Sequence, residues 1–214
     1  MRHKLAIPAG CEYTVVMSGS RPALALVLVL LATMPSFAQG IGPDSSGALP
    51  AVEQPPWPLT IPGYTELDPD TGLHMTGSPQ RISLVDYRLK VTGKVERPQS
   101  LGFDEIRRLP RQAAKSALIC KGYFEDYANW AGASLGALLD RAGLEPSARW
   151  IELVSADGYS TNVTLAQASS PTAFLAYELE GRVLPVLHGF PLRAVFPALD
   201  GNNWAKWLVE IRVR

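Results

Sequence analysis

The chain of 214 residues is poor in metal-binding side chains and has no surplus of charge of either sign. Its 2 Cys and 3 His are too few for two zinc sites or an iron–sulfur cluster, and they allow at most one disulfide. The 20 basic and 20 acidic side chains give a net charge of zero. Because nucleic acids are bound by a surplus of Lys and Arg on one surface, we expect no nucleic-acid partner.

The chain has the composition of a globular domain and contains one long apolar run near its N-terminus. Apolar types make up 47% of the residues and charged types 19%, which excludes disorder over the whole chain. The run Ala23–Thr33 is followed by small residues at the signal-peptidase positions of Ser36–Ala38. Pro35 ends it well short of the roughly 20 apolar residues of a membrane-spanning helix. We therefore predict a secretory signal peptide over residues 1–38, cleavage after Ala38, and a periplasmic or secreted protein.

Removal of this peptide changes the number of reactive side chains. Three basic and one acidic side chain leave with it, so the net charge changes from 0 to −2. Cys11 leaves as well, so Cys120 is the one thiol that stays and no internal disulfide can form. A lone thiol in an oxidising compartment is a liability unless it is buried or used. The polar stretch before Ser18 makes Met17 an alternative start.

Proline and hydrophobic periodicity divide the rest of the chain. Eight Pro residues fall between residues 39 and 81, and because Pro excludes helix and removes backbone donors, we predict an extended Pro-rich tether there. The folded domain is predicted over residues 82–214. Short helices are expected after Ser100 and from Ser134 to Gly143. Strand patterns cover Asp86–Val91, Ala113–Cys120, Trp150–Val154, Tyr159–Leu165, Thr172–Leu179, Arg182–Leu184, Leu192–Phe196 and Trp207–Val213.

Strands outnumber helices in this pattern, and no strand–helix–strand alternation appears. An α+β fold is therefore expected, with strand-rich mixed sheets and short helices. Two hairpins are predicted from turn residues, one at Asp157-Gly158 and one at Glu180-Gly181. We find no internal repeat.

Two segments have residue types that could carry chemistry. Cys120 ends an apolar strand beside Lys121, and an electropositive neighbour with access to solvent suits thiolate chemistry or metal ligation. The alternative is a buried structural Cys that behaves as a small hydrophobe. The segment His188–Arg193, followed by Trp204 and Lys206, could bind an anion such as a phosphate. A His beside a turn is more often held in place by a structural hydrogen bond.

Several short motifs follow one another in a fixed order through the predicted domain. They are the strand-terminal Cys120, Trp130-Ala131-Gly132 before a Leu-rich helix, Ser155–Tyr159, Leu175–Glu178, Leu184-Pro185, His188–Arg193 and Lys206–Leu208. This series resembles the molybdopterin-binding domain of the sulfite oxidase family over about Val85–Val213. The resemblance implies a sulfite-oxidase-type fold and a molybdenum–molybdopterin cofactor.

The resemblance also implies roles for single residues. Cys120 would be the protein thiolate that binds molybdenum beside the dithiolene sulfurs, and a soft thiolate suits such a centre. The residues implied to hold the pterin and its phosphate are Asp157, His188, Arg193, Trp204, Ala205 and Lys206. Those expected around the catalytic Cys120 on the substrate side are Lys121, Tyr123 and Asp126.

Departures from sulfite oxidases bear on the substrate. The spacing from Cys120 to Trp130 resembles the periplasmic methionine sulfoxide reductase branch, and Glu125 stands where sulfite oxidases have an Arg that holds the anion. Because a carboxylate repels sulfite, we expect oxygen-atom transfer on another small substrate, such as a sulfoxide. The resemblance implies a haem or cytochrome protein as redox partner. It ends before the dimerisation domain of sulfite oxidases, and we expect a monomer.

Two other hypotheses stay open at this point. The family's N-terminal pterin loop, with its Arg and His, has no clear counterpart apart from His74, and the leader has no twin-arginine pair. These departures favour a cofactor-free binding module that keeps the fold. A cysteine enzyme that uses Cys120 with His188 is the other hypothesis.

Overall fold

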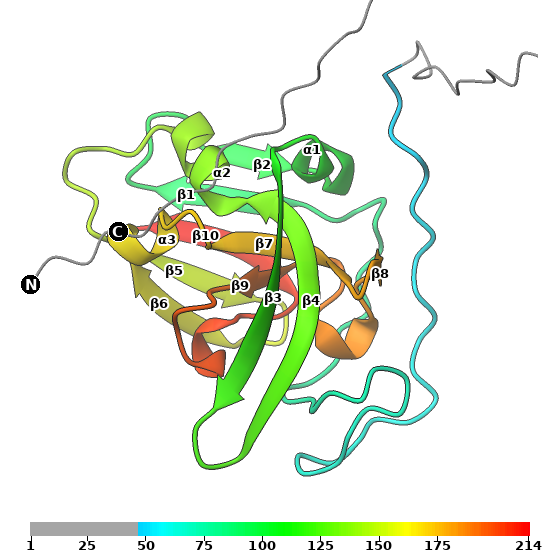
Figure 1. Cartoon of the computed structure of the whole chain (residues 1–214). Helices are drawn as coiled ribbons and strands as arrows, with labels where there is room; N and C mark the ends of the chain where they lie inside the picture. Colours follow the sequence, from blue (N-terminus) through cyan, green and yellow to red (C-terminus); the bar gives the residue numbers. More distant parts are fainter. Residues whose placement is uncertain (1–46) are drawn as a thin grey trace, which may run out of the picture. The chain divides into compact units, whose positions relative to one another are not determined.

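The computed structural model describes residues 47–214 (Figure 1). The predicted signal peptide of residues 1–38, and residues 39–46 of the predicted tether, lie outside the described residues. The described part contains two five-stranded sheets and a few short helices, which confirms the strand-rich α+β prediction. Among the helices of residues 47–214, none has the length and apolarity needed to cross a membrane.

The first sheet has the strand order β2-β1-β10-β5-β6. Its strands are β1 (Leu89–Gly93), β2 (Gln99–Leu101), β5 (Trp150–Ser155), β6 (Ser160–Thr164) and β10 (Leu208–Val213). β1 and β10 pair in parallel although they lie at opposite ends of the domain sequence, and the other pairs are antiparallel. β5 and β6 form the hairpin predicted from Asp157-Gly158. Residue alternation decides which face is buried, as in β1, where Leu89 and Val91 are buried and Lys90 is exposed.

The second sheet contains the longest strands of the described residues. It consists of β3 (Arg111–Cys120), β4 (Phe124–Ser134), β7 (Phe174–Leu179), β8 (Arg182–Val183) and β9 (Arg193–Val195). β3 and β4 form a long hairpin, drawn in green in Figure 1. The turn of this hairpin uses Gly122 at φ +82° and brings Cys120 opposite Phe124. β4 also pairs with β7, so its backbone is hydrogen-bonded on both sides.

The helices are α1 (Phe103–Arg107), α2 (Leu135–Ala142) and α3 (Leu165–Ala168), with 3-10 turns at Val186–His188 and Gly201–Asn203. The predicted ends of α2 are confirmed, since the Ser134 side chain accepts a hydrogen bond from Ala137 N and Gly143 is the C-cap. The prediction that Ser100 caps α1 is wrong. Ser100 pairs with Lys90 in the first sheet, and the N-cap is Gly102.

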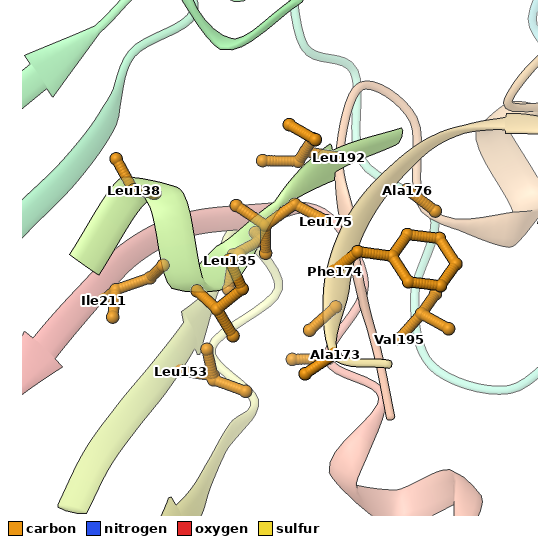
Figure 2. Packing of buried hydrophobic residues seen from close by; sticks show 14 of the residues in the cluster. Leu135, Leu138, Leu153, Ala173, Phe174, Leu175, Ala176, Leu192, Val195 and Ile211 are labelled. Carbon is orange, nitrogen blue, oxygen red and sulfur yellow. The ribbon is translucent and has the colours of Figure 1, made fainter. Parts of the chain in front are cut away.

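One hydrophobic cluster joins α2 to both sheets. Figure 2 shows Leu135 and Leu138 of α2 near Leu153 and Ile211 of the first sheet and Leu175 of the second. All of these side chains are fully buried. Burial of each such side chain stabilises a fold by about 1.5–3 kcal/mol. The cluster therefore fixes the strand ends that carry the site residues described below.

Part of the predicted tether packs as an integral part of the domain. Asp68, Leu73 and Met75 are buried, and Leu67 forms an isolated bridge with His74. The two apolar side chains account for the burial of a segment whose prolines predicted only an extended chain. This packing places residues 64–77 beside the segments that contain Cys120 and Lys206.

Candidate functional site

A cavity of about 270 Å³ collects side chains from four separate parts of the sequence. They come from residues 64–77, from the hairpin of β3 and β4, from the turn after β5, and from the stretch between β9 and β10. Six residues that the sequence singled out line it: Cys120, Asp157, Arg193, Trp204, Ala205 and Lys206. The fold therefore brings together the strand-terminal thiol and the basic segment, which are more than 70 residues apart in the sequence.

The thiol of Cys120 is half-buried at the end of β3. Burial raises the pKa of this thiol, while the nearby charges of Arg193 and Lys206 act in the opposite direction. Gly201 packs against this thiol: a Cβ at that position would stand 3.2 Å from Cys120 Sγ and 2.8 Å from Leu118 Cδ1. A raised pKa disfavours a free thiolate nucleophile, whereas a bound metal ion deprotonates a coordinating thiol.

One side of the cavity, which we call the buried wall, consists of Arg193, Trp204, Ala205 and Lys206. All four are at most 9% exposed. Burial lowers the pKa of Arg193 to about 9 and lowers that of Lys206 well below its usual value. Within residues 47–214 neither cation has a carboxylate in an ion pair. Buried charges are normally paired, so the buried wall is suited to an anion.

The remaining contacts of the buried cations are with carbonyl groups and aromatic rings. Arg193 Nη1 donates to the carbonyl of His188 at 3.3 Å, and the guanidinium carbon lies 4.7 Å from the ring centre of Trp130 and 5.6 Å from that of Trp204. Arg193 Nε has no hydrogen-bond partner among the described residues. Lys206 Nζ donates to the carbonyls of Thr76 and Leu187. These contacts orient the cations without neutralising them.

A second group of lining residues, which we call the open wall, consists of Tyr64, His74 and Phe124. The rings of His74 and Phe124 stack with centroids 4.4 Å apart and an interplanar angle of 9°. Tyr64 meets Phe124 edge-on at 6.4 Å and is 47% exposed. An aromatic and partly solvated wall suits a ligand that enters and leaves.

Four of the residues singled out in the sequence lie off the cavity lining. Lys121 is exposed and pairs with Asp200 at 2.9 Å, and Tyr123 is exposed against the ring of Tyr64. Asp126 is buried and binds His74. His188 is buried, and its Nε2 lies 2.8 Å from Asp68 Oδ2 and 2.8 Å from Thr71 Oγ1. Burial lowers the pKa of His188 to about 4.

Sequence reasoning missed most of the residues that the N-terminal segment contributes. Tyr64, Thr76 and Gly77 line the cavity although they fall in the predicted tether, and His74, which also lines it, was noted only as a lone counterpart of the family's pterin loop. The signal that could have revealed them is the pair Leu73 and Met75, two apolar residues that flank His74 in a polar, Pro-rich stretch. Gly201 was also missed as a packing partner of Cys120, because nothing local to it requires a glycine.

The described residues contain no cluster of three or more His, Cys, Asp or Glu that could enclose a metal ion. Cys120 is thus a single soft donor next to two buried cations rather than a member of a protein metal cage. Such a donor set suits a metal whose other ligands belong to an anionic cofactor.

Comparison with known proteins identifies relatives of this chain. Residues 75–214 match the family model described as oxidoreductase molybdopterin binding domain. The oxidoreductase YuiH of Bacillus subtilis (strain 168) is 33% identical over 141 residues, which is 65% of this chain and 71% of that protein. The sulfite oxidase of Arabidopsis thaliana is 32% identical over 166 residues, which is 61% of this chain and 42% of that protein.

A solved structure supports the fold. The sulfane dehydrogenase SoxCD from Paracoccus pantotrophus aligns with a TM-score of 0.61 and 23% identity, and the alignment covers 86% of this chain and 58% of that one. The predicted sulfite-oxidase-type fold is confirmed by this likeness, which concerns the fold alone. The chain spans well under half the length of the plant sulfite oxidase.

Proposed function

The chain belongs to the oxidoreductase molybdopterin-binding domain family, and on this premise we propose that it is an oxidoreductase that binds molybdenum–molybdopterin through Cys120. We propose further that it transfers an oxygen atom to or from a small substrate. One observation carries the proposal: the thiol of Cys120 shares a cavity with two buried and unpaired cations, Arg193 and Lys206.

The residues of the cavity fit such a cofactor. Molybdopterin has a phosphate at one end and the pterin at the other, with its dithiolene on the pyran ring between them, and the buried wall offers the cations that a phosphate needs. The unpartnered Nε of Arg193 is a further donor for an anion. Gly201 packs closely against Cys120 Sγ, where a Cβ would stand 3.2 Å from the sulfur. A thiol and two cations therefore occur together in this cavity.

The cofactor, when bound, would supply the two-electron redox change of its metal. The residues of the chain would hold and orient it: Cys120 as the thiolate ligand, and Arg193 and Lys206 as the phosphate-binding cations. The carbonyls of Thr76 and Leu187 fix the direction of the Lys206 ammonium. Trp130 and Trp204 cover the guanidinium of Arg193 and keep it in a medium of low dielectric, where its attraction to an anion is strong.

We propose that the substrate is not sulfite. Glu125 is exposed, accepts a hydrogen bond from the hydroxyl of Tyr127 and does not line the cavity. Its carboxylate would therefore act on a dianion through the local electrostatic field rather than by contact. A neutral oxo compound, such as a sulfoxide, would escape this repulsion.

Export and an electron partner complete the proposal. The apolar run Ala23–Thr33 and the small residues of Ser36–Ala38 support a periplasmic or secreted protein. Oxygen-atom transfer leaves the protein with two electrons to gain or lose, so we propose a haem or cytochrome protein as the partner that exchanges them.

The geometry gives less support to the two other hypotheses. A cofactor-free module would leave the guanidinium of Arg193 buried without a counter-charge, which is an unfavourable arrangement. A cysteine enzyme would need His188 beside Cys120. His188 instead uses its Nε2 for Asp68 and Thr71 and does not line the cavity.

The test is the molybdenum content of protein purified from a host that makes the cofactor. We expect stoichiometric molybdenum in the wild type, and an affinity lower by more than about 100-fold in Cys120→Ser, because even residues behind the ligands change metal affinity 10- to 100-fold. Cys11→Ser is the matched control and should bind like the wild type, since it falls in the predicted signal peptide. A well-folded wild-type protein without molybdenum would overturn the proposal in favour of the cofactor-free module.

A further inference from the structure

The mechanism proposed above leaves one hydrogen-bonded pair unused, which joins His74 of the cavity lining to Asp126 behind it. Asp126 is 6% exposed, and its two carboxylate oxygens accept two hydrogen bonds from one residue. The backbone N–H of His74 donates to Oδ2 at 2.6 Å, and Nδ1 of the His74 ring lies 2.9 Å from Oδ1. The partners are 52 residues apart, so the pair exists only in the folded domain.

These contacts determine the tautomer of His74. An ionised carboxylate can only accept hydrogen bonds, so Nδ1 has to carry the proton that it shares with Asp126. Nε2 of the neutral ring is then a lone-pair acceptor. One face of the ring is covered by Phe124, and Nε2 has no hydrogen-bond partner among residues 47–214. It is the polar ring atom that remains for a ligand in the cavity.

The position of His74 favours the substrate over the cofactor as that ligand. Phe124, on which the imidazole stacks, lies opposite Cys120 in the hairpin register. His74 is 21% exposed and stands in the open wall with Tyr64. The cations that suit the phosphate are in the buried wall. An exchanging molecule would therefore meet His74 at the more exposed side of the cavity.

We propose that His74 is a substrate-binding residue whose Nε2 accepts a hydrogen bond from the substrate, and that Asp126 is its positioning residue. Because Nε2 is an acceptor, the substrate has to present an N–H or O–H donor close to the atom that gains or loses oxygen. Among the neutral oxo compounds proposed above, this favours those that carry such a donor beside the oxo group, and it disfavours a simple dialkyl sulfoxide, which can only accept hydrogen bonds. The inference rests on the proposed function and narrows its substrate class.

Nitrogen-15 NMR of His-labelled, cofactor-loaded protein tests the tautomer. The sequence has 3 His, and His188 serves as an internal reference with its own carboxylate, Asp68. We expect His74 protonated at Nδ1. In Asp126→Asn the side chain has one oxygen acceptor instead of two. One of the two hydrogen bonds from His74 is then lost, and we expect the ring proton to move from Nδ1 toward Nε2. Glu125→Gln, the same change at the neighbouring residue, should leave His74 unchanged because its side chain bonds Tyr127.

Two neutral probes of similar size test the contact. Methanesulfonamide carries an N–H donor, whereas dimethyl sulfone has acceptors alone. We expect the first probe to shift the His74 Nε2 signal and the second to leave it in place. In His74→Phe the dissociation constant of methanesulfonamide should rise about 3- to 10-fold, as for a lost neutral hydrogen bond, and that of dimethyl sulfone should stay the same. His74→Gln keeps an acceptor and should restore part of the affinity.

The outcomes separate this inference from the proposed function. The inference would be overturned if the two probes had equal effects on the Nε2 signal, or if that signal shifted on cofactor loading alone. Stoichiometric molybdenum would still support the proposed function in either case. A wild-type protein without molybdenum would overturn the function. The tautomer and the response to the two probes are still measurable in that protein, so a failure of either proposal can be recognised by itself.

Discussion

The buried wall and the open wall of the cavity differ in origin, exposure and charge. The buried wall comes from β9 and the stretch before β10, and it holds two cations that are almost inaccessible to solvent. The open wall comes from residues 64–77 and the start of β4, and it holds aromatic rings and one imidazole. A permanently bound anion can compensate the buried cations, while a rim of partly exposed rings suits a ligand that exchanges. The two walls thus divide cofactor retention from substrate contact.

Arg193→Met in the buried wall should have the largest effect and should act in opposite directions on two properties. Removal of a buried cation that has no carboxylate partner should stabilise the metal-free protein by about 1–4 kcal/mol. The same change should reduce cofactor affinity about 10- to 100-fold. Chemical denaturation and molybdenum analysis measure the two effects. The exposed Arg182→Met is the matched control, and equal effects of both variants would contradict the division of roles.

The pH dependence of stability should reveal Lys206. Burial lowers its pKa well below the usual value, so at a pH between the folded and the unfolded pKa this residue holds its proton in the unfolded state more than in the folded state. The unfolded state then binds more protons, and the stability of the metal-free protein should rise with pH by up to about 1.4 kcal/mol per unit. Denaturation midpoints between pH 7 and 8 measure this slope.

This pH range isolates Lys206 from its neighbours. It lies above the range of His188, whose pKa is lowered to about 4, and below that of Arg193, whose pKa is about 9. The raised pKa of Cys120 acts above the usual value of 9.0. Lys206→Met should flatten the slope, and a bound anionic cofactor should do so too by keeping Lys206 charged. A slope that persists in Lys206→Met would refute this assignment.

Gly201→Ala should displace the thiol of Cys120. Its Cβ would stand 2.8 Å from Leu118 Cδ1 and 3.2 Å from Cys120 Sγ, closer than the packing allows. We expect a destabilisation of about 1–3 kcal/mol together with weaker metal retention. Gly136→Ala in α2 meets only Ser134 Oγ at 3.9 Å and serves as the control. If Gly201→Ala kept the full wild-type molybdenum content, metal binding would not depend on the exact position of the thiol.

Phe124→Leu in the open wall should have the smallest effect. The stacked pair with His74 is lost, which corresponds to about 0.5–1.5 kcal/mol. Probe binding should weaken, whereas molybdenum content should stay at the wild-type level because no cation of the buried wall is touched. Calorimetric titration with methanesulfonamide and molybdenum analysis of the same sample test both expectations. A loss of molybdenum here would show that the walls are not independent.

Local sequence signals predicted the parts of the fold that depend on local contacts. The cap at Ser134, the Gly143 that ends α2 and the turn at Asp157-Gly158 were all recognisable, because each is decided within a few residues. Ser100 was misassigned as a cap because its strand pairing with β1 overrides its capping propensity. β4 was missed because a strand with Glu125, Asp126 and Gly132 lacks β-branched residues, and pairing on both sides stabilises it instead.

The candidate site, like the fold, was predictable from the sequence except where it depends on contacts between distant segments. The resemblance indicated Cys120, Arg193 and Lys206, and the structure places all three on one cavity. It could not indicate that Asp126 would bind His74, because that contact joins a strand to a Pro-rich segment 52 residues earlier. Long-range pairs of this kind become visible only once the chain is folded.

The central claim is that Cys120 is a ligand of molybdenum. X-ray absorption at the molybdenum edge, on the wild type and on the metal that Cys120→Ser retains, tests it most directly because it counts sulfur ligands. The account predicts a sulfur coordination number lower by one in the variant than in the wild type. The same sulfur count in both proteins would contradict it.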